Sequence, residues 1–289
     1  MRVAIIGGSG KMGRWFASFL LQDGKEVIIT GRKEEKLLEA KEQLGVEVTS
    51  NNIEAVKSAN IVLISVPIDN FEEVVKQLQP HLNPKQIVID ITSIKEFPIE
   101  IMHKYIKTGL VLGAHPVFGP GAKDLLNQNF VLTPTNEPET TLAQKVKQYL
   151  EVRGAGVTLM TPHEHDEMMA VILGLSHFIS IVSADTLLSF DNFKQMEAIG
   201  GTTYKVLVML IESVISEDPE LYASLQMHLS GLAEIEALFE KNSKTWADIV
   251  KNKDAQEFVR RMSTLKDRLE KSDPDSRRAY ENMYKLLRG

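Results

Sequence analysis

The residues Val3–Gly13, VAIIGGSGKMG, decide the fold of this chain. They join a short apolar run to the loop Gly8-Ser9-Gly10-Lys11-Met12-Gly13, which has the spacing G-x-G-x-x-G and opens a helical pattern. Between a strand and a helix, such a loop binds the pyrophosphate of a dinucleotide. Gly8 permits the tight turn, Gly10 lets the backbone approach the pyrophosphate, and Gly13 lets helix and strand pack closely. We therefore expect all six loop residues to bind a cofactor, with phosphates on the free N–H groups of the helix N-terminus.

Further apolar runs follow the first one, and amphipathic charged stretches separate them. Strands that are buried on both faces read as continuous apolar runs rich in valine and isoleucine. Their alternation with helical patterns predicts a doubly wound parallel α/β sheet of the Rossmann type. The predicted strands after the first are Glu26–Thr30, Ile61–Val66, Ile87–Ile91, Leu110–Ala114 and, shorter, Phe130–Leu132 and Val157–Met160.

The second half of the chain contains no strand-like run after Pro162 and is predicted to be all helical, with breaks near Pro219, Lys241–Ser243 and Ser272–Ser276. We place a dinucleotide-binding domain at 1–161 and a helical substrate and dimerisation domain at 162–289. The run Met168–Val182 has no formal charge but is shorter than the roughly 18–20 residues of a membrane span. It is predicted to be a buried helix, and its apolar sides indicate a partner subunit.

The composition of the 289 residues excludes several classes of protein. Without cysteine there is no disulfide framework, thiolate zinc site or cysteine nucleophile. Thirty-three basic and 39 acidic residues give a net charge of −6, which argues against a nucleic-acid partner. The N-terminal apolar run is too short for a signal peptide. We therefore expect a cytoplasmic protein with a small-molecule substrate.

The tetrapeptide His163-Glu164-His165-Asp166 looks like a metal cluster. However, residues two apart on a helix do not face each other, and no third ligand follows at a suitable spacing. A helix-start cap is the better interpretation, and we expect no metal site.

The residues after the second predicted strand indicate which dinucleotide is bound. An NAD site usually has Asp or Glu at this position to hold the ribose diol, whereas a 2′-phosphate needs a cation. Here Thr30-Gly31-Arg32 carries no acidic residue, and the planar guanidinium of Arg32 suits a phosphate. Thr30 adds a hydroxyl group. We expect NADP, with NAD as the alternative.

The carboxyl ends of the parallel strands are predicted to line one crevice, since ligands of doubly wound sheets bind there. The segments concerned are Val66–Asp69, Asp90–Lys95 and Ala114–Gly121. From them we expect Val66, Pro67 and Thr92 at the cofactor.

His115 is the candidate proton acceptor because prolines and glycines stiffen its loop at a strand end. Ser93 is expected to orient its ring, and Lys95 to contact a substrate carboxylate or the cofactor amide. His177 lies inside the charge-free helix, where its spacing alone favours a hydrogen-bonded core histidine.

Four ordered motifs resemble the prephenate/arogenate dehydrogenases of tyrosine biosynthesis, and the similarity covers nearly the whole chain. A further stretch, Asp218–Ala223, is similar to a helical segment of the same family. The resemblance implies a Rossmann domain followed by a helical domain that forms a homodimer. The motifs are DITSIK (Asp90–Lys95), GAHPVFGP (Gly113–Pro120), EHDEMMA (Glu164–Ala170) and LSHF (Leu175–Phe178).

The resemblance also implies a reaction and roles for three residues. In that family, hydride leaves the hydroxyl-bearing ring carbon for a nicotinamide while a ring carboxylate departs as CO2. His115 then takes the hydroxyl proton, and Ser93 orients the ring of His115. His177 matches a histidine beside substrate and nicotinamide, so Ser93, Lys95, His115 and His177 are the expected substrate-binding residues.

One position departs from the family pattern. An arginine that grips a substrate carboxylate is expected where this chain has Gly231. Because a dicarboxylate needs cationic partners, His228, Arg153 and the pair Arg260-Arg261 are candidate replacements. The departure argues against prephenate itself and leaves open arogenate, an altered binding mode or a different small acid.

Two alternative functions remain from the sequence. The N-terminal loop and Gly31-Arg32 are also similar to deazaflavin-dependent NADP reductases, although those enzymes give no reason for the block around His115. The second alternative is an NADP-binding regulator without catalysis, which the glycine at 231 favours and His115, Ser93 and His177 oppose.

Overall fold

The apolar run Val3–Ile6 lies inside an eight-stranded sheet, in a computed structural model that describes residues 1–288 of the chain. The strand order is β3-β2-β1-β4-β5-β6-β7-β8. All seven strands predicted from the sequence are present. The strands are β1 (Arg2–Ile6), β2 (Glu26–Thr30), β3 (Glu47–Thr49), β4 (Ile61–Ile64), β5 (Ile87–Asp90), β6 (Leu110–Pro116), β7 (Asn129–Thr133) and β8 (Gly156–Leu159).

The sheet differs from the prediction at its two ends. Strand β3 was not predicted, since its three residues are half-buried or exposed and it pairs with β2 at the sheet edge. Strand β7 runs antiparallel to β6, with His115 opposite Val131 and Pro116 opposite Phe130. The pairs from β3 to β6 are all parallel, so the carboxyl ends of β1, β4, β5 and β6 lie at one edge.

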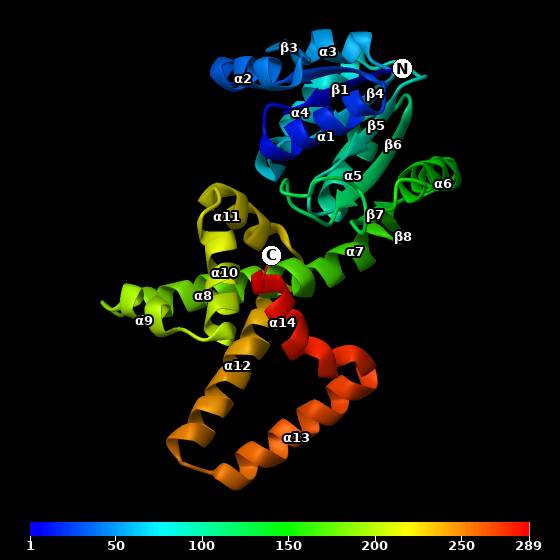
Figure 1. Ribbon diagram of the computed structural model, residues 1–289. Helices are drawn as coiled ribbons and strands as arrows, with labels where there is room; N and C mark the ends of the chain where they lie inside the picture. The colour runs from blue at the N-terminus through cyan, green and yellow to red at the C-terminus, as the bar shows by residue number, and fades with distance from the viewer. Residues whose placement is uncertain (289) are drawn as a thin grey trace. The chain divides into compact units, whose positions relative to one another are not determined.

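Helices cover both faces of the sheet, as the doubly wound pattern predicts (Figure 1). On one face, apolar residues of three helices pack against side chains such as Ile5 and Leu112. On the other face, a second set packs against Ala4, Ile6 and Val88. The first set is α1 (Lys11–Gln22), α2 (Glu34–Leu44) and α6 (Glu137–Glu151), and the second is α3 (Asn52–Ser58), α4 (Phe71–Leu78) and α5 (Glu96–Tyr105).

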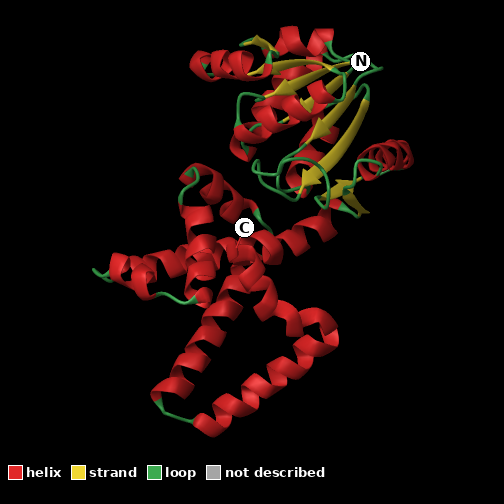
Figure 2. Cartoon of the chain, in the orientation of Figure 1, coloured by secondary structure: helices red, strands yellow, loops and turns green. Residues whose placement is uncertain are grey.

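The chain divides into two compact units, a Rossmann unit and a helical unit. The Rossmann unit is Met1–Met169 with Ala223–Leu229, and the helical unit is Ala170–Tyr222 with Ser230 onward. The domain boundary near Thr161 stays a prediction. In the described residues no strand follows Leu159, as expected (Figure 2).

The helical unit is built around α8 (Ser176–Leu188) packed on α10 (Thr202–Ile215) and a π-helical segment, η3 (Ala170–Leu175), packed on α12 (Leu232–Lys251). Gly174 in η3 permits close packing, because a Cβ there would lie 2.6 Å from Cδ1 of Leu232. The expected break at Lys241–Ser243 is wrong, since α12 continues through it with these side chains exposed. The remaining helices are α7 (Pro162–Met169), η3 (Ala170–Leu175), α8 (Ser176–Leu188), α9 (Phe193–Ile199), α10 (Thr202–Ile215), α11 (Pro219–His228), α12 (Leu232–Lys251), α13 (Ala255–Ser272) and α14 (Ala279–Arg288).

The charge-free run lies in one continuous helical stretch, Pro162–Leu188. By length and composition this stretch could cross a membrane, a test that core helices of soluble proteins also pass. Only 17% of its most apolar window is buried within the chain. The expected burial is therefore not supplied by this chain alone.

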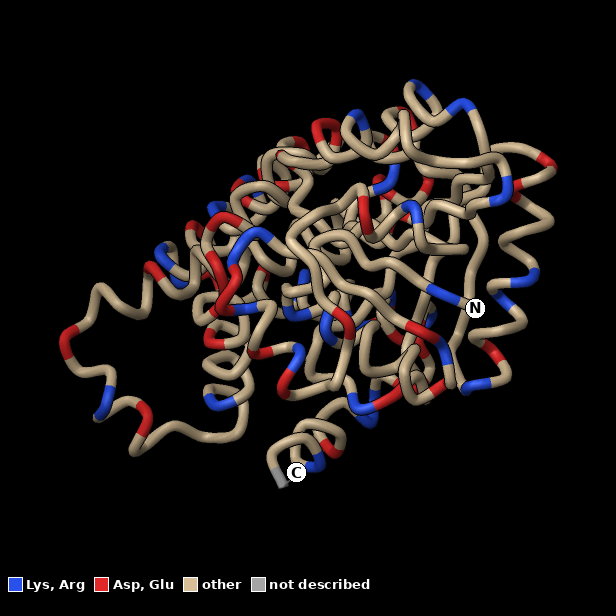
Figure 3. Tube along the Cα trace, turned by 90° about the horizontal axis from the view of Figure 1, so that it is seen from above, with Lys and Arg blue, Asp and Glu red and all other residues tan. Residues whose placement is uncertain are grey.

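Basic and acidic residues are interspersed along the chain (Figure 3). With a net charge of −6, this distribution gives no reason to expect a nucleic-acid partner.

Candidate active site

The glycine-rich loop after β1 has the geometry of a phosphate cradle, and Gly7 makes its turn. Gly7 has a φ of +77°, and a Cβ there would collide with the carbonyl of Ser65. The sequence assigned the tight turn to Gly8, whose φ is not positive, so this assignment is corrected to Gly7. Gly7 N–H also donates to the hydroxyl of Thr30 at 3.1 Å, which fixes the loop to β2.

Gly8 and Gly13 are required by close packing beneath the loop. A Cβ on Gly8 would lie 2.7 Å from Cβ of Ile29, and one on Gly13 would lie 2.5 Å from Cα of Gly8. Gly13 in α1 therefore packs directly against Gly8 of the loop that follows β1. Gly10 is the N-cap of α1, and no side chain caps the helix there. The N-terminus of α1 carries a partial positive charge, which fits the pyrophosphate of a dinucleotide.

The residues beyond β2 differ in their access to a cofactor. Thr30 is fully buried and its hydroxyl accepts from Gly7, so it supports the loop and the expected cofactor contact is wrong. Arg32 is exposed and forms no ion pair within residues 1–288. Its guanidinium is available for a phosphate group.

The carboxyl edge of the sheet brings the predicted segments together. Val66, which follows β4, packs against Gly7 of the phosphate loop. Pro67 is exposed next to it, and Thr92 and Ser93 after β5 are half-buried. The Thr92 hydroxyl donates to the carbonyl of Ile94 at 3.0 Å, while its N–H binds the Asp90 carboxylate.

Lys95 lies beneath this edge and not at its surface. Its ammonium group is fully buried, forms an ion pair with Asp90 and donates to the carbonyl of Ala114 at 2.9 Å. The expectation that Lys95 contacts the substrate is therefore wrong, because its side chain joins the ends of β5 and β6. Burial lowers the pKa of Lys95, while the charge of Asp90 opposes that shift.

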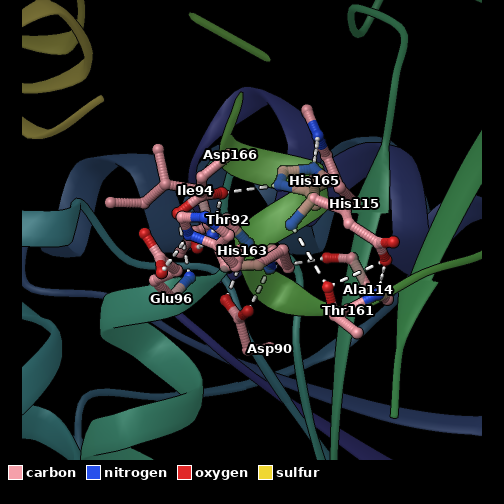
Figure 4. A network of polar contacts seen from close by, with 12 residues as sticks. Asp90, Thr92, Ile94, Glu96, Ala114, His115, Thr161, His163, His165 and Asp166 are labelled. Carbon is pink, nitrogen blue, oxygen red and sulfur yellow. Dashed lines mark hydrogen bonds and ion pairs between the residues drawn. The ribbon is translucent and has the colours of Figure 1, made fainter. Parts of the chain in front are cut away.

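His115 stands at the end of β6 in a network that runs to α7 (Figure 4). Its Nδ1 lies 2.8 Å from Nε2 of His165, and Nδ1 of His165 lies 2.6 Å from Oδ1 of Asp166. All three side chains are buried. Ser93, which was expected to orient His115, makes no hydrogen bond to it among residues 1–288, and His165 takes that place.

Burial sets the protonation of both histidines. Desolvation lowers the pKa of His115 well below its usual value of 6.5, and the neighbouring His165 and Lys95 charges lower it further. Desolvation also lowers the pKa of His165, although its hydrogen bond to Asp166 opposes the shift. His115 is therefore neutral near pH 7, which is the state a proton acceptor requires.

The start of α7 confirms the predicted helix cap. Glu164 accepts from the N–H of Thr161 at 2.9 Å, and the Thr161 hydroxyl accepts from the N–H of Glu164 at 3.2 Å. This reciprocal pair is a capping box. In residues 1–288, no group of three His, Cys, Asp or Glu side chains is placed to hold a metal ion. The sequence missed His165 and Asp166 because they were assigned to this cap.

His177 lies in α8 of the helical unit, where its ring packs edge-on against Tyr222 with centroids 4.8 Å apart. Its Nδ1 is buried and has no hydrogen-bond partner within residues 1–288. Desolvation lowers the pKa of this ring. A satisfied core histidine would have a partner, so the structure departs from that interpretation and leaves a nitrogen for a ligand.

Gly231 has a φ of +76° and open space at its Cβ, so an arginine there would strain the backbone. Arg153 is bound to Asp23 at 2.5 Å, and Arg260 and Arg261 both pair with Glu257 on their own helix. Of the candidate replacements, His228 is the one beside the crevice segments. Its Nε2 lies 3.7 Å from Asp69, and its ring centroid lies 6.2 Å from that of Phe97.

Comparison with known families gives two matches along the chain. The model of the prephenate dehydrogenase nucleotide-binding domain matches residues 16–159. The model of the prephenate dehydrogenase dimerization domain matches residues 161–264. Together they cover both halves of the chain in the expected order.

Individual proteins agree with these matches. A probable arogenate/prephenate dehydrogenase of Methanocaldococcus jannaschii is 38% identical over 91% of this chain and 59% of its own length. The T-protein of Haemophilus influenzae is 28% identical over 92% of this chain and 66% of its own length. The chain thus spans less than two thirds of these relatives.

A solved structure supports the fold. The prephenate dehydrogenase of Aquifex aeolicus, in complex with hydroxyphenyl propionate and NAD+, superposes with a TM-score of 0.77 and 23% identity. The match covers 94% of this chain and 98% of the other.

Proposed function

The chain belongs to the prephenate dehydrogenase family, and on that premise we propose that it oxidatively decarboxylates prephenate or arogenate in tyrosine biosynthesis. The observation that carries the proposal is His115, a buried histidine held neutral at the carboxyl edge of the sheet. Its Nδ1 is bound to His165, and its Nε2 has no hydrogen-bond partner in the described residues. That nitrogen is the base for the substrate hydroxyl.

The proposed reaction transfers one proton and one hydride and releases CO2. His115 accepts the hydroxyl proton while the C–H electron pair leaves as hydride. The bond from the ring to its carboxylate breaks, CO2 is released, and the ring becomes aromatic. When bound, a nicotinamide dinucleotide supplies the hydride acceptor. General-base catalysis of this kind contributes about 10²–10⁴-fold to the rate.

The cofactor is held by the loop Gly8–Gly13 and the N-terminus of α1, and we propose NADP as the preferred form. The exposed Arg32 supports this preference, because a guanidinium binds a 2′-phosphate in a planar, bidentate manner. No acidic residue stands at the end of β2 to hold a ribose diol, as an NAD site would need. Val66, Pro67 and Thr92 complete this proposed site.

The substrate is assigned to Ser93, His115 and His177, with His228 as a further candidate. Ser93 is half-buried at the same sheet edge as His115, and the unpartnered Nδ1 of His177 is suited to a polar substrate group. His228 would carry a positive charge only when protonated, so it is a weaker carboxylate partner than an arginine. Both prephenate and arogenate carry two carboxylates, so both stay in the proposal.

We also propose a homodimer formed through the helical unit. An apolar hollow of about 240 Å³ lies between α8 and α10. Leu188 beside it is 65% exposed, and the matching family model is a dimerization domain. A second copy would cover the apolar helix Pro162–Leu188, and this cover supports our proposal of a cytoplasmic location. The hollow is lined by Leu187, Leu188, Phe193, Val208, Ile211 and Ile215.

The proposal is tested with purified protein and the near-ultraviolet absorbance of reduced nicotinamide. The assay combines prephenate or arogenate with NADP or NAD, in four pairings. Reduction with one substrate and faster turnover with NADP is the expected result. Absence of reduction in every pairing, with dinucleotide binding retained, would contradict the proposal and favour a cofactor-binding regulator.

A further inference from the structure

We propose that His165 and Asp166 are positioning residues that hold the proton of His115 on Nδ1 and so reserve Nε2 for the substrate. This inference deepens the proposed function, since the use of Nε2 as a base rests on it. The tautomer itself is a property of the free protein and does not depend on the substrate.

The carboxylate of Asp166 determines which nitrogen of His165 carries the proton. Its Oδ1 accepts from the N–H of Lys95 at 2.7 Å, and its Oδ2 accepts from the N–H of Glu96 at 2.9 Å. The carboxylate thereby caps α5, whose N-cap Lys95 provides no side-chain cap of its own. An ionised carboxylate only accepts hydrogen bonds, so Nδ1 of His165 must be the donor in their 2.6 Å contact.

The tautomer of His165 in turn determines the tautomer of His115. A neutral imidazole with its proton on Nδ1 has a lone pair on Nε2. Since Nε2 of His165 lies 2.8 Å from Nδ1 of His115, that lone pair accepts and Nδ1 of His115 donates. The free lone pair of His115 is then on Nε2. The partner of one ring nitrogen thus decides the role of the other.

The surroundings keep both rings neutral before the reaction. The charged groups that face them are the ammonium of Lys95 and the carboxylates of Asp90 and Asp166. Lys95 is paired with Asp90, whereas Asp166 touches His165 directly. When His115 takes the substrate proton, its Nδ1–H still donates to His165, whose own Nδ1–H donates to the carboxylate of Asp166. This is how a buried imidazole can hold a positive charge transiently.

The tautomers can be read directly by long-range proton–nitrogen NMR of the full chain labelled in its seven histidines. Spectra of single histidine variants assign the rings of His115 and His165. We expect both rings to carry the proton on Nδ1 at neutral pH. We also expect His165→Phe to release His115 from that form. A wild-type His115 protonated on Nε2 would overturn the proposal.

Kinetics supply the second test. In His165→Phe, Nδ1–H of His115 loses its acceptor, so we expect kcat to fall about 10–10²-fold, as when a partner that fixes a histidine tautomer is removed. The acid limb of the kcat/KM profile should also shift, since the hydrogen bond that His165 accepts and the repulsion between the two rings are lost together. In His165→Gln, an amide oxygen replaces Nε2 as acceptor, and kcat should recover to within about tenfold of wild type.

His163→Phe is the matched control, since His163 lies on the same helix, is 66% exposed and pairs with Glu96 and Glu167. It should leave kcat and the acid limb unchanged. If His165→Phe binds dinucleotide and keeps both the kcat and the acid limb of the wild type, the positioning role is wrong. If His115→Asn is fully active, the proposed function fails instead, which separates the two claims.

Discussion

The Rossmann unit and the helical unit differ in how far they bury their apolar side chains. In the Rossmann unit, Ile5, Ile29 and Leu112 are completely buried between sheet and helices. In the helical unit, Leu188, Leu238 and Ile199 are 65%, 56% and 86% exposed. The first unit covers its own apolar surface, whereas the second leaves much of it open.

The units also differ in what they bury besides apolar groups. The Rossmann unit encloses charged and polar side chains, among them Asp90, Lys95, His115, His165 and Asp166. Buried charges are retained only when paired, so this unit is fixed around one polar arrangement. The proposals above therefore place the proton acceptor in the first unit and the dimer contact in the second. The predictions below test that division.

The largest expected effect is on turnover, from His115→Asn. Asparagine keeps a polar side chain of similar reach but has no basic nitrogen, so kcat should drop by about 10²–10⁴-fold. Binding of NADPH, followed by its fluorescence, should stay within a factor of about two, because the phosphate loop is untouched. Full activity in this variant would show that the proton acceptor is not His115 of the Rossmann unit.

The next effect is on stability, from Lys95→Met. The substitution leaves the carboxylate of Asp90 buried without its partner, which should lower the free energy of unfolding by about 3–5 kcal/mol. The double variant Asp90→Asn with Lys95→Met removes both charges and should recover most of the loss. Urea unfolding followed by circular dichroism measures both. Equal stability of the single and double variants would show that the pair is not buried.

Assembly should respond to the helical unit alone. Leu188→Glu places a charge in the exposed apolar surface and should convert a dimer into monomers, as measured by light scattering without detergent. Val152→Glu is the control, since Val152 is 73% exposed in the Rossmann unit, and it should leave the mass unchanged. A wild-type protein that is monomeric, or that needs detergent to stay in solution, would contradict the homodimer.

Cofactor preference should respond to Arg32. Arg32→Ala removes a charge-assisted hydrogen bond worth about 1.5–3 kcal/mol, so the Kd for NADP should rise about 10–100-fold. The Kd for NAD should not change. Lys36→Ala, an exposed cation on α2, serves as the control. Equal weakening of NADP and NAD by Arg32→Ala would place Arg32 outside the 2′-phosphate site.

The smallest effect is a pH dependence of stability. Burial lowers the pKa of His115, His165 and His177 below 6.5, so the native state resists protonation that the unfolded chain accepts. Stability from these groups is fully present above pH 6.5 and is lost as the pH falls below it. The thermal midpoint should therefore decrease between pH 6.5 and about pH 5. A constant midpoint over that interval would mean that the rings are hydrated.

The fold could be predicted because its strands are continuous apolar runs, such as Ile61–Val66, and its loop glycines have a fixed spacing. Strand β3 escaped prediction because Glu47-Val48-Thr49 is too short and too polar to form such a run. The antiparallel β7 could not be recognised either, since an apolar run does not record the direction in which its strand pairs.

The site was predicted in part for similar reasons. The position of His115 followed from topology, since strand ends share one edge. The partners of His115 did not, because His165 lies fifty positions away and the distance along the chain carries no information about ring contacts. Lys95 was assigned to the substrate by its location at a strand end, although its side chain turns inward to Asp90. The sequence predicted where these residues lie in the fold, but it did not predict the direction in which their side chains point.

The most direct test of the account is to measure CO2 release together with cofactor reduction by the purified 289-residue chain. Substrate labelled in the ring carboxylate should yield equal amounts of labelled CO2 and reduced nicotinamide, and His115→Asn should slow both together. Reduction without CO2, or CO2 release that His115→Asn leaves unchanged, would contradict the assignment of oxidative decarboxylation to this site.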